Sequence, residues 1–280
     1  MRLLLLLAAA AALLLVLIAV AQRRLIYFPS RDVPDPRALG FPQIEDARFT
    51  AEDGVALHGW FAPAAGAPRR LAVLVSHGNA GNVAHRLHLL ADLPAAGLDV
   101  LVYDYRGYGE SEGSPSEAGL YRDGRAAQAW LLQRTGLPAA RLVHFGESLG
   151  AAVSVELARA EPAPGAVILQ SPFTSLADVA GEHYPLLPVR LLLRDRYENA
   201  AKIGALRAPL LVLHGTDDSI VPLANGRALF ERATAEPKRF VEVRGAGHND
   251  LWLDERARTA DVVAFLDEVL PSVAGATDAR

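Results

Sequence analysis

Hydrophobic residues along this chain form short runs that alternate with amphipathic stretches. The stretches with helical periodicity lie at 83–94, 116–135, 149–160, 223–234 and 251–269. The apolar runs of strand length lie at 71–78, 100–104, 141–146, 166–170, 209–215 and 239–243. These runs are continuous rather than alternating, which is typical of strands buried on both faces of a parallel sheet. The pattern therefore predicts an α/β fold in which helices cross over between mostly parallel strands.

Two further stretches, at 48–52 and 55–62, precede these runs and alternate between apolar and polar residues. They are separated by Asp53-Gly54, and Asp-Gly between alternating runs is a hairpin signal. An antiparallel hairpin is therefore predicted to lead into the parallel sheet. No internal repeat or linker interrupts residues 25–280, which we interpret as one domain.

The N-terminal segment is different, because residues 3–21 form one unbroken apolar run. As a helix the run would span ~28 Å, close to the ~30 Å hydrocarbon core of a bilayer. Its lack of a polar face disfavours a buried core helix and favours an uncleaved single-pass anchor within residues 1–24. The alternative is a cleaved signal peptide, with Ala19-Val20-Ala21 as the cleavage site and an exported product. More arginines follow the run than precede it, which places the domain on the cytoplasmic side of a membrane under the anchor hypothesis.

Composition excludes several classes of protein. Of the 280 residues, 51% are hydrophobic and 21% are charged, which is incompatible with a disordered chain. The net charge of −4 argues against a nucleic-acid binder that relies on positive charge. The chain has no cysteine, so a disulfide scaffold, a thiolate zinc site and a cysteine nucleophile are all excluded.

The motif Gly-x-Ser-x-Gly occurs twice, at 109–113 and at 146–150. In a nucleophile elbow the serine must sit between a strand and a helix. Ser148 has a predicted strand before it and a predicted helix after it. Ser111 is flanked by glycine-rich and proline-containing turn residues on both sides. We therefore predict that Ser148 is a nucleophile and that Ser111 is a loop hydroxyl.

A serine nucleophile needs a base and an orienting acid. His248 lies in a loop with two glycines just past the last predicted strand, and the other seven histidines are expected to be structural. The acid should follow the penultimate strand, where Asp217 and Asp218 are neighbours. The apolar segment 220–222 would fix the loop directly after Asp218, so Asp218 is predicted as the acid and Asp217 as a capping or solvated residue.

Six ordered motifs together resemble the α/β-hydrolase superfamily and, more narrowly, its membrane-anchored serine hydrolases of the bud-emergence (Bem) type. The motifs lie at 77–82, 104–109, 146–150, 171–175, 214–218 and 247–249, and the resemblance runs from about residue 25 to the end. It implies the α/β-hydrolase fold for a catalytic domain at 25–280. It also implies Ser148 as nucleophile, His248 as base and Asp218 as acid. The backbone amides of Asn79 and Leu149 are implied as the oxyanion hole.

The expected activity is therefore hydrolysis of an acyl ester or thioester through an acyl-enzyme, as in carboxylesterases, lipases and acyl-thioesterases, without a metal or organic cofactor. The expected substrate is a small-molecule or lipid acyl compound. Segment 171–208 is predicted as a small cap, and its apolar part, 184–193, could either favour acyl chains or simply pack as a connecting helix. The alternatives are a peptidase, amidase or acyltransferase on the same fold, or a non-catalytic binding protein. The sequence does not indicate an oligomeric state.

Overall fold

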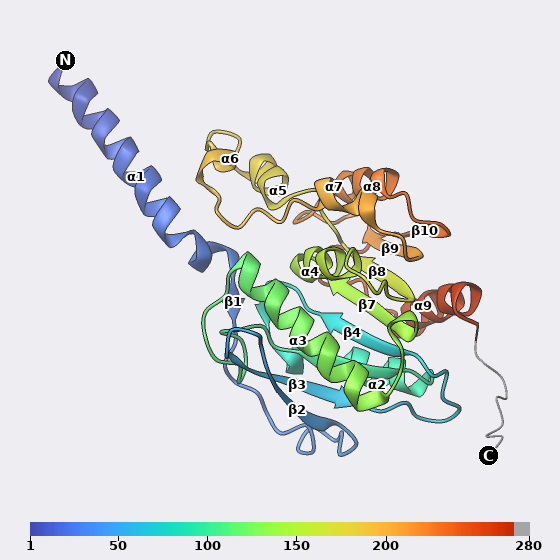
Figure 1. Ribbon diagram of the computed structural model, residues 1–280. Helices are drawn as coiled ribbons and strands as arrows, with labels where there is room; N and C mark the ends of the chain where they lie inside the picture. Colours follow the sequence, from blue (N-terminus) through green and yellow to red (C-terminus); the bar gives the residue numbers. More distant parts are fainter. Residues whose placement is uncertain (272–280) are drawn as a thin grey trace.

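The computed structural model describes residues 1–271, except for the side chains of four residues of the first helix, and is built around one large sheet (Figure 1). The last nine residues of the predicted domain 25–280 lie outside the described residues. The eight strands of the sheet run in the order β10-β9-β8-β7-β4-β6-β3-β2. They are β2 (Glu45–Thr50), β3 (Ala56–Ala62), β4 (Ala72–Ser76), β6 (Asp99–Tyr103), β7 (Leu142–Glu147), β8 (Ala166–Gln170), β9 (Leu210–Gly215) and β10 (Lys238–Val243). Two residues each of β1 (Phe28–Pro29) and β5 (Ala80–Gly81) form a second, small sheet.

The strand directions confirm the predicted mostly parallel sheet with an N-terminal hairpin. The strands from β6 to β10 pair in parallel, whereas β3 pairs antiparallel with both β2 and β6. The hairpin turns at Asp53-Gly54, and Gly54 has a φ of +83°, a conformation that glycine adopts without a steric cost. The Asp-Gly signal therefore located the turn between β2 and β3.

Helices cover both faces of the sheet. Successive residues of each buried strand point to opposite faces and so pack against different helices. Val73 and Val75 of β4 belong to a core cluster with α2 and α9, whereas Leu74 packs into a cluster with α3 and α4. A third cluster joins α4 to α8. These helices are α2 (Leu87–Ala95), α3 (Glu117–Thr135), α4 (Leu149–Ala158), α8 (Leu223–Arg232) and α9 (Glu255–Val269).

The predicted helix boundaries differ from the observed ones mainly where a side chain caps the first turn. The helix expected from residue 251 begins at Glu255, because the Asp254 side chain accepts a hydrogen bond from the Ala257 amide at 3.0 Å. The helix expected from residue 83 starts with one 3₁₀ turn, η1 (Val83–Arg86), which Asn82 caps in the same way. Short polar residues before a periodic run therefore set these start points.

The first helix, α1 (Arg2–Ile26), projects from the sheet domain (Figure 1). When only the described residues are considered, no helix meets both the length and the apolar content needed to cross a membrane. This finding contradicts the predicted single-pass anchor through residues 3–21, and we correct the membrane localisation and cytoplasmic orientation that depended on it. The predicted boundary at residue 24 also falls inside α1. The end of this helix contacts the domain, since Gln22 Nε2 donates to the Leu192 carbonyl at 3.1 Å and Arg23 Nε to Asp195 Oδ2 at 3.0 Å.

The segment 171–208 connects β8 to β9 and contains α5 (Leu176–His183), α6 (Val189–Leu192), α7 (Asn199–Lys202) and the 3₁₀ turn η3 (Ile203–Ala205). Its two ends are anchored in the core through Phe173, Tyr197 and Ile203, which are buried. Its middle is exposed at Leu186 and Leu191. No residue of the apolar part at 184–193 is fully buried, and the action of the segment as a substrate cap stays a prediction.

A buried histidine in β7 makes the stability of the domain sensitive to acid. His144 is almost fully buried, and within residues 1–271 its Nδ1 has no hydrogen-bond partner. Burial lowers the pKa of His144 to about 4, whereas a histidine in the unfolded chain has a pKa of about 6.5. As the pH falls from 6.5 through 4, the unfolded chain binds a proton that the folded state does not, so stability is lost in that window.

We therefore expect His144→Leu to reduce the loss of stability between pH 7 and pH 5 by up to about 2 kcal/mol. Urea unfolding of the wild type and the variant at both pH values measures the difference. Comparing the two slopes cancels the contributions of the other histidines. Equal slopes for the two proteins would show that His144 does not titrate differently on folding.

Candidate active site

Ser148 stands at a sharp turn between β7 and α4. Its backbone has φ 50° and ψ −109°, a conformation that L-residues rarely adopt and that is expected of a nucleophile elbow. The turn is tight because its glycines allow close backbone contacts. A Cβ atom on Gly150 would lie 1.8 Å from the Ser76 carbonyl oxygen, and one on Gly146 would lie 2.5 Å from the Gly150 carbonyl oxygen. The two glycines of the motif therefore let strand and helix approach closely enough to expose the Ser148 side chain.

The structure brings the three predicted catalytic side chains together. The Ser148 Oγ lies 3.0 Å from Nε2 of His248, and Nδ1 of the same ring lies 2.7 Å from Oδ2 of Asp218. A carboxylate can only accept hydrogen bonds, so Nδ1 carries the proton that bonds to Asp218. In the neutral ring Nε2 is then unprotonated and can accept the hydroxyl proton of Ser148.

Backbone amides hold Asp218 in place, and neighbouring histidines help to keep it ionised. Its Oδ1 accepts hydrogen bonds from the amides of Ile220 at 3.0 Å and Val221 at 2.8 Å, the apolar segment that the sequence predicted would fix this loop. Burial alone would raise the pKa of Asp218. The nearby His214 ring and the hydrogen bonds from His248 and the Val221 amide outweigh burial and hold this pKa well below its usual range. Asp218 is therefore a stable anionic partner for an imidazolium ring.

The neighbouring aspartate points elsewhere. Asp217 is exposed, and its Oδ1 accepts a hydrogen bond from the Thr216 hydroxyl at 2.8 Å. Its backbone amide donates to the Ala246 carbonyl at 3.0 Å, which ties the loop after β9 to the loop that carries His248. Asp217 thus contributes to loop structure, and its side chain is not the one that contacts His248.

The serine of the other Gly-x-Ser-x-Gly motif, at 109–113, has a structural role. Ser111 is fully buried; its Oγ donates to the Asp104 carbonyl at 2.8 Å and accepts the His58 amide at 2.9 Å. Both hydrogen-bonding functions of this hydroxyl are therefore used to join the loop after β6 to β3.

The loop after β4 contains the predicted oxyanion donor Asn79. Nδ1 of His77 lies 2.7 Å from the Gly78 carbonyl oxygen, so Nδ1 carries a proton and donates it there. In a planar trans peptide the N–H of the following residue, here Asn79, points in the opposite direction from the Gly78 carbonyl. The Asn79 amide therefore points away from His77, and Asn79 lines the same cavity as Ser148. Leu149, the second predicted donor, begins α4 directly after Ser148.

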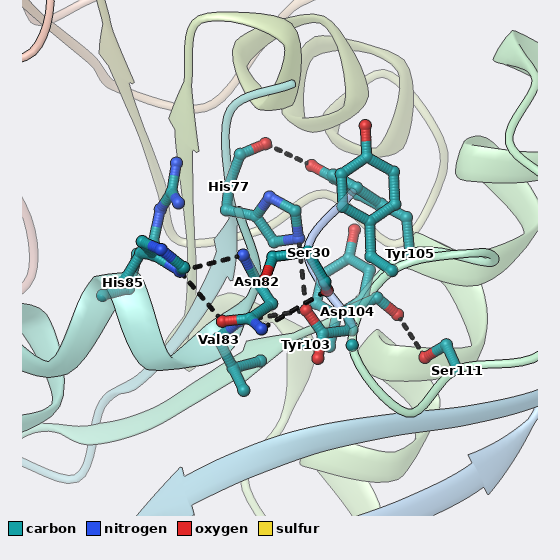
Figure 2. Close-up of polar contacts among 12 residues, drawn as sticks. Ser30, His77, Asn82, Val83, His85, Tyr103, Asp104, Tyr105 and Ser111 are labelled. Carbon is teal, nitrogen blue, oxygen red and sulfur yellow. Dashed lines mark hydrogen bonds and ion pairs between the residues drawn. The ribbon is translucent and has the colours of Figure 1, made fainter. Parts of the chain in front are cut away.

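A buried polar cluster contacts this loop and holds it in place (Figure 2). Asp104 Oδ1 accepts the Val83 amide at 3.0 Å and lies 3.7 Å from Nε2 of His77, while the Tyr105 hydroxyl donates to the His77 carbonyl at 2.7 Å. The Tyr108 hydroxyl donates to the Asn79 carbonyl at 2.7 Å. The motif at 104–109 contains Asp104, Tyr105 and Tyr108. Their contacts with the loop after β4 could not be derived from the sequence, because these contacts depend on the placement of β6 beside β4.

A cavity of about 500 Å³ opens beside Ser148 and His248. Arg86 borders it and joins β5 to the end of β7, since Arg86 Nε donates to Glu147 Oε2 at 2.9 Å and Nη1 to the Ala80 carbonyl at 3.0 Å. A larger cavity of about 680 Å³ lies between α5, α6 and α8, but it includes none of the residues that line the first one. We therefore take the smaller cavity as the candidate substrate site because it contains the reactive side chains.

Comparisons with known proteins agree with this fold. A family model described as serine aminopeptidase, S33, matches residues 67–196. The chain is 47% identical over 248 residues to the uncharacterized protein Rv2307c of Mycobacterium tuberculosis, covering 88% of each chain. It is 34% identical over 254 residues to the alpha/beta hydrolase domain-containing protein WAV2 of Arabidopsis thaliana, covering 83% of this chain and 82% of WAV2.

Solved structures show the same architecture. The esterase Pf2001 of Pyrococcus furiosus superimposes with a TM-score of 0.71 at 21% identity, covering 88% of this chain and 98% of that one. An alpha-beta hydrolase of Vibrio vulnificus gives a TM-score of 0.69 at 19% identity, covering 84% of this chain and 88% of that one. At these identities the likeness establishes the arrangement of helices and strands.

Proposed function

Because the chain belongs to the α/β-hydrolase superfamily, we propose that it is a serine hydrolase that cleaves acyl esters or thioesters, with Ser148 as nucleophile. His248 acts as the base, and Asp218 orients its ring. The observation that carries this proposal is the pair of contacts made by the His248 ring. Its Nε2 lies 3.0 Å from Ser148 Oγ, and its Nδ1 lies 2.7 Å from Asp218 Oδ2. The motifs quoted above also support a narrower place among the bud-emergence-type serine hydrolases.

The reaction follows from these contacts. Ser148 Oγ attacks the substrate carbonyl carbon while its proton moves to Nε2 of His248, and the carboxylate of Asp218 stabilises the resulting imidazolium. The backbone amides of Asn79 and Leu149 donate to the oxyanion, and loss of one such donor typically costs 10²–10³ in kcat. His248 then protonates the leaving group, and an activated water releases the acyl group from Ser148 and restores the triad.

Two observations bear on the scissile bond. Several structural neighbours are described as esterases, including Pf2001 and an esterase domain of Rhodothermus marinus, which favours an ester. The matching family model is described as a serine aminopeptidase, which favours an amide as the second candidate. The same nucleophile and base serve either bond, so the choice depends on the groups that line the cavity.

A fluorophosphonate probe is expected to label the wild-type protein at Ser148, because such probes react with activated serines. Mass spectrometry of the digested adduct identifies the labelled residue. A panel of 4-nitrophenyl butyrate, butyryl-CoA and alanine 4-nitroanilide then ranks ester, thioester and amide. A folded protein that takes up no probe would refute the serine hydrolase, and preference for the anilide would make it an aminopeptidase.

A further inference from the structure

Several polar side chains line the cavity beside Ser148. Among the residues lining it, Trp252 is the one large apolar side chain within the part of the chain that the structure describes. Most polar groups in the wall are already paired with protein. The guanidinium of Arg86 contacts Glu147 and Ala80, and the Gln170 amide oxygen accepts from Trp252 Nε1 at 2.6 Å. The polar groups in the wall that have no protein partner are therefore the ones left for a substrate.

Ser171 is an exception in this wall, because its hydroxyl is unpaired. The residue follows β8, lines the cavity and is 1% exposed, yet no described residue pairs with its Oγ. A buried hydroxyl without a partner is unfavourable relative to one that is hydrogen-bonded. The backbone of Ser171 is also strained, with a φ of 46° that a glycine would adopt at no steric cost. Ser171 thus occupies a position where both its side chain and its backbone are unfavourable.

A second unpaired polar atom lines the same cavity. Nε2 of His88 is buried and lacks a hydrogen-bond partner among residues 1–271, and the His88 ring packs 5.5 Å from the Trp252 ring. Burial lowers the pKa of His88, so the ring is neutral near pH 7 and has a nitrogen available for a neutral hydrogen bond. Ser171 and His88 therefore both line one cavity of about 500 Å³, and each side chain has one buried polar atom without a partner among residues 1–271.

We propose that Ser171 is a specificity residue whose hydroxyl bonds to a hydroxyl group of the substrate, so that the enzyme prefers small hydroxylated esters. This inference rests on the proposed serine hydrolase activity and narrows its substrate class. A site built to hydrogen-bond a substrate hydroxyl discriminates against the analogue that lacks it, because the buried protein groups are then left unpaired. His88 supplies a second contact for a substrate with more than one hydroxyl group.

Three esters of similar size test the preference. Propyl butyrate has no hydroxyl group, propyl 3-hydroxybutyrate has one on the acyl side of the scissile bond, and glycerol monobutyrate has two on the alcohol side. Initial rates are followed by pH-stat titration. The wild type is expected to show at least about tenfold higher kcat/KM for one of the hydroxylated esters than for propyl butyrate, and the side that is favoured locates the hydroxyl group.

Two variants of Ser171 separate the hydroxyl from the backbone strain. Ser171→Ala keeps the strained φ, whereas Ser171→Gly relieves it, and both remove the hydroxyl. Both are expected to lower kcat/KM for the preferred ester about tenfold, the effect of one hydrogen bond, and to leave propyl butyrate within about twofold. Ser154→Ala is the matched control, because Ser154 is a fully buried serine of α4 that lies outside the cavity lining and whose Oγ has no partner among residues 1–271.

The outcomes distinguish this inference from the activity on which it rests. Equal rates on all three esters, or an equal loss on all three in Ser171→Ala, would overturn the specificity role while leaving the hydrolase intact. A wild type that labels with a fluorophosphonate but cleaves none of the three would also overturn it. A wild type that neither labels nor hydrolyses would refute the serine hydrolase itself.

Discussion

Ser148→Ala is expected to abolish hydrolysis, with a loss of roughly 10⁶ in kcat, as in a serine protease that loses its nucleophile. The variant should fold normally, because the Ser148 side chain contributes one contact, to His248, and little packing. The strained φ of 50° is kept by alanine, so stability should change little. The measurement is kcat on 4-nitrophenyl butyrate, with circular dichroism and thermal unfolding to verify the fold.

Ser111→Ala is the matched control, since it removes the serine of the other Gly-x-Ser-x-Gly motif. Ser111 joins the Asp104 carbonyl to the His58 amide, so its loss leaves a buried N–H unpaired and is expected to cost about 1–3 kcal/mol of stability. Activity per folded molecule should remain. An inactive Ser111→Ala beside an active Ser148→Ala would show that the wrong serine had been assigned to the elbow.

The sheet and the elbow could be predicted because their signals are local. Continuous apolar runs identified β4 and β6 to β10, and the strand-turn-helix context separated Ser148 from Ser111 without any knowledge of tertiary structure. Asp218 was predicted because an apolar segment follows it. In the structure the amides of Ile220 and Val221 in this segment donate to the Asp218 carboxylate.

Other features depend on contacts between distant segments. The support of the Asn79 loop by Tyr108 arises only when β6 lies beside β4, and the contact of α1 with Leu192 and Asp195 joins residues about 170 positions apart. The docking of α1 was missed for the same reason, because the sequence analysis treated residues 3–21 as an isolated run, whereas the helix continues to Ile26 and its end contacts the domain. The strained backbone of Ser171 could not be predicted either, because a serine followed by a proline does not indicate a positive φ.

The two adjacent aspartates provide the other large expected effect. Asp218→Asn fits the same space, and its amide oxygen can still accept from the Ile220 and Val221 amides. Its NH₂ group would then face Nδ1 of His248, which would have to accept rather than donate. The ring proton would move to Nε2, where it blocks transfer from Ser148. In the serine protease case this wrong tautomer costs about 10⁴ in kcat, and we expect a loss of that order here.

Asp217→Asn is the neighbouring control and should cost less than about tenfold in kcat/KM. Asp217 is exposed, and an asparagine oxygen can accept the same hydrogen bond from the Thr216 hydroxyl. The ionised carboxylate of Asp218 remains in this variant, so the tautomer of His248 is unchanged. Both variants are compared on 4-nitrophenyl butyrate with their fold verified by circular dichroism. A larger loss in Asp217→Asn than in Asp218→Asn would move the acid to Asp217 and require the loop after β9 to rearrange in the working enzyme.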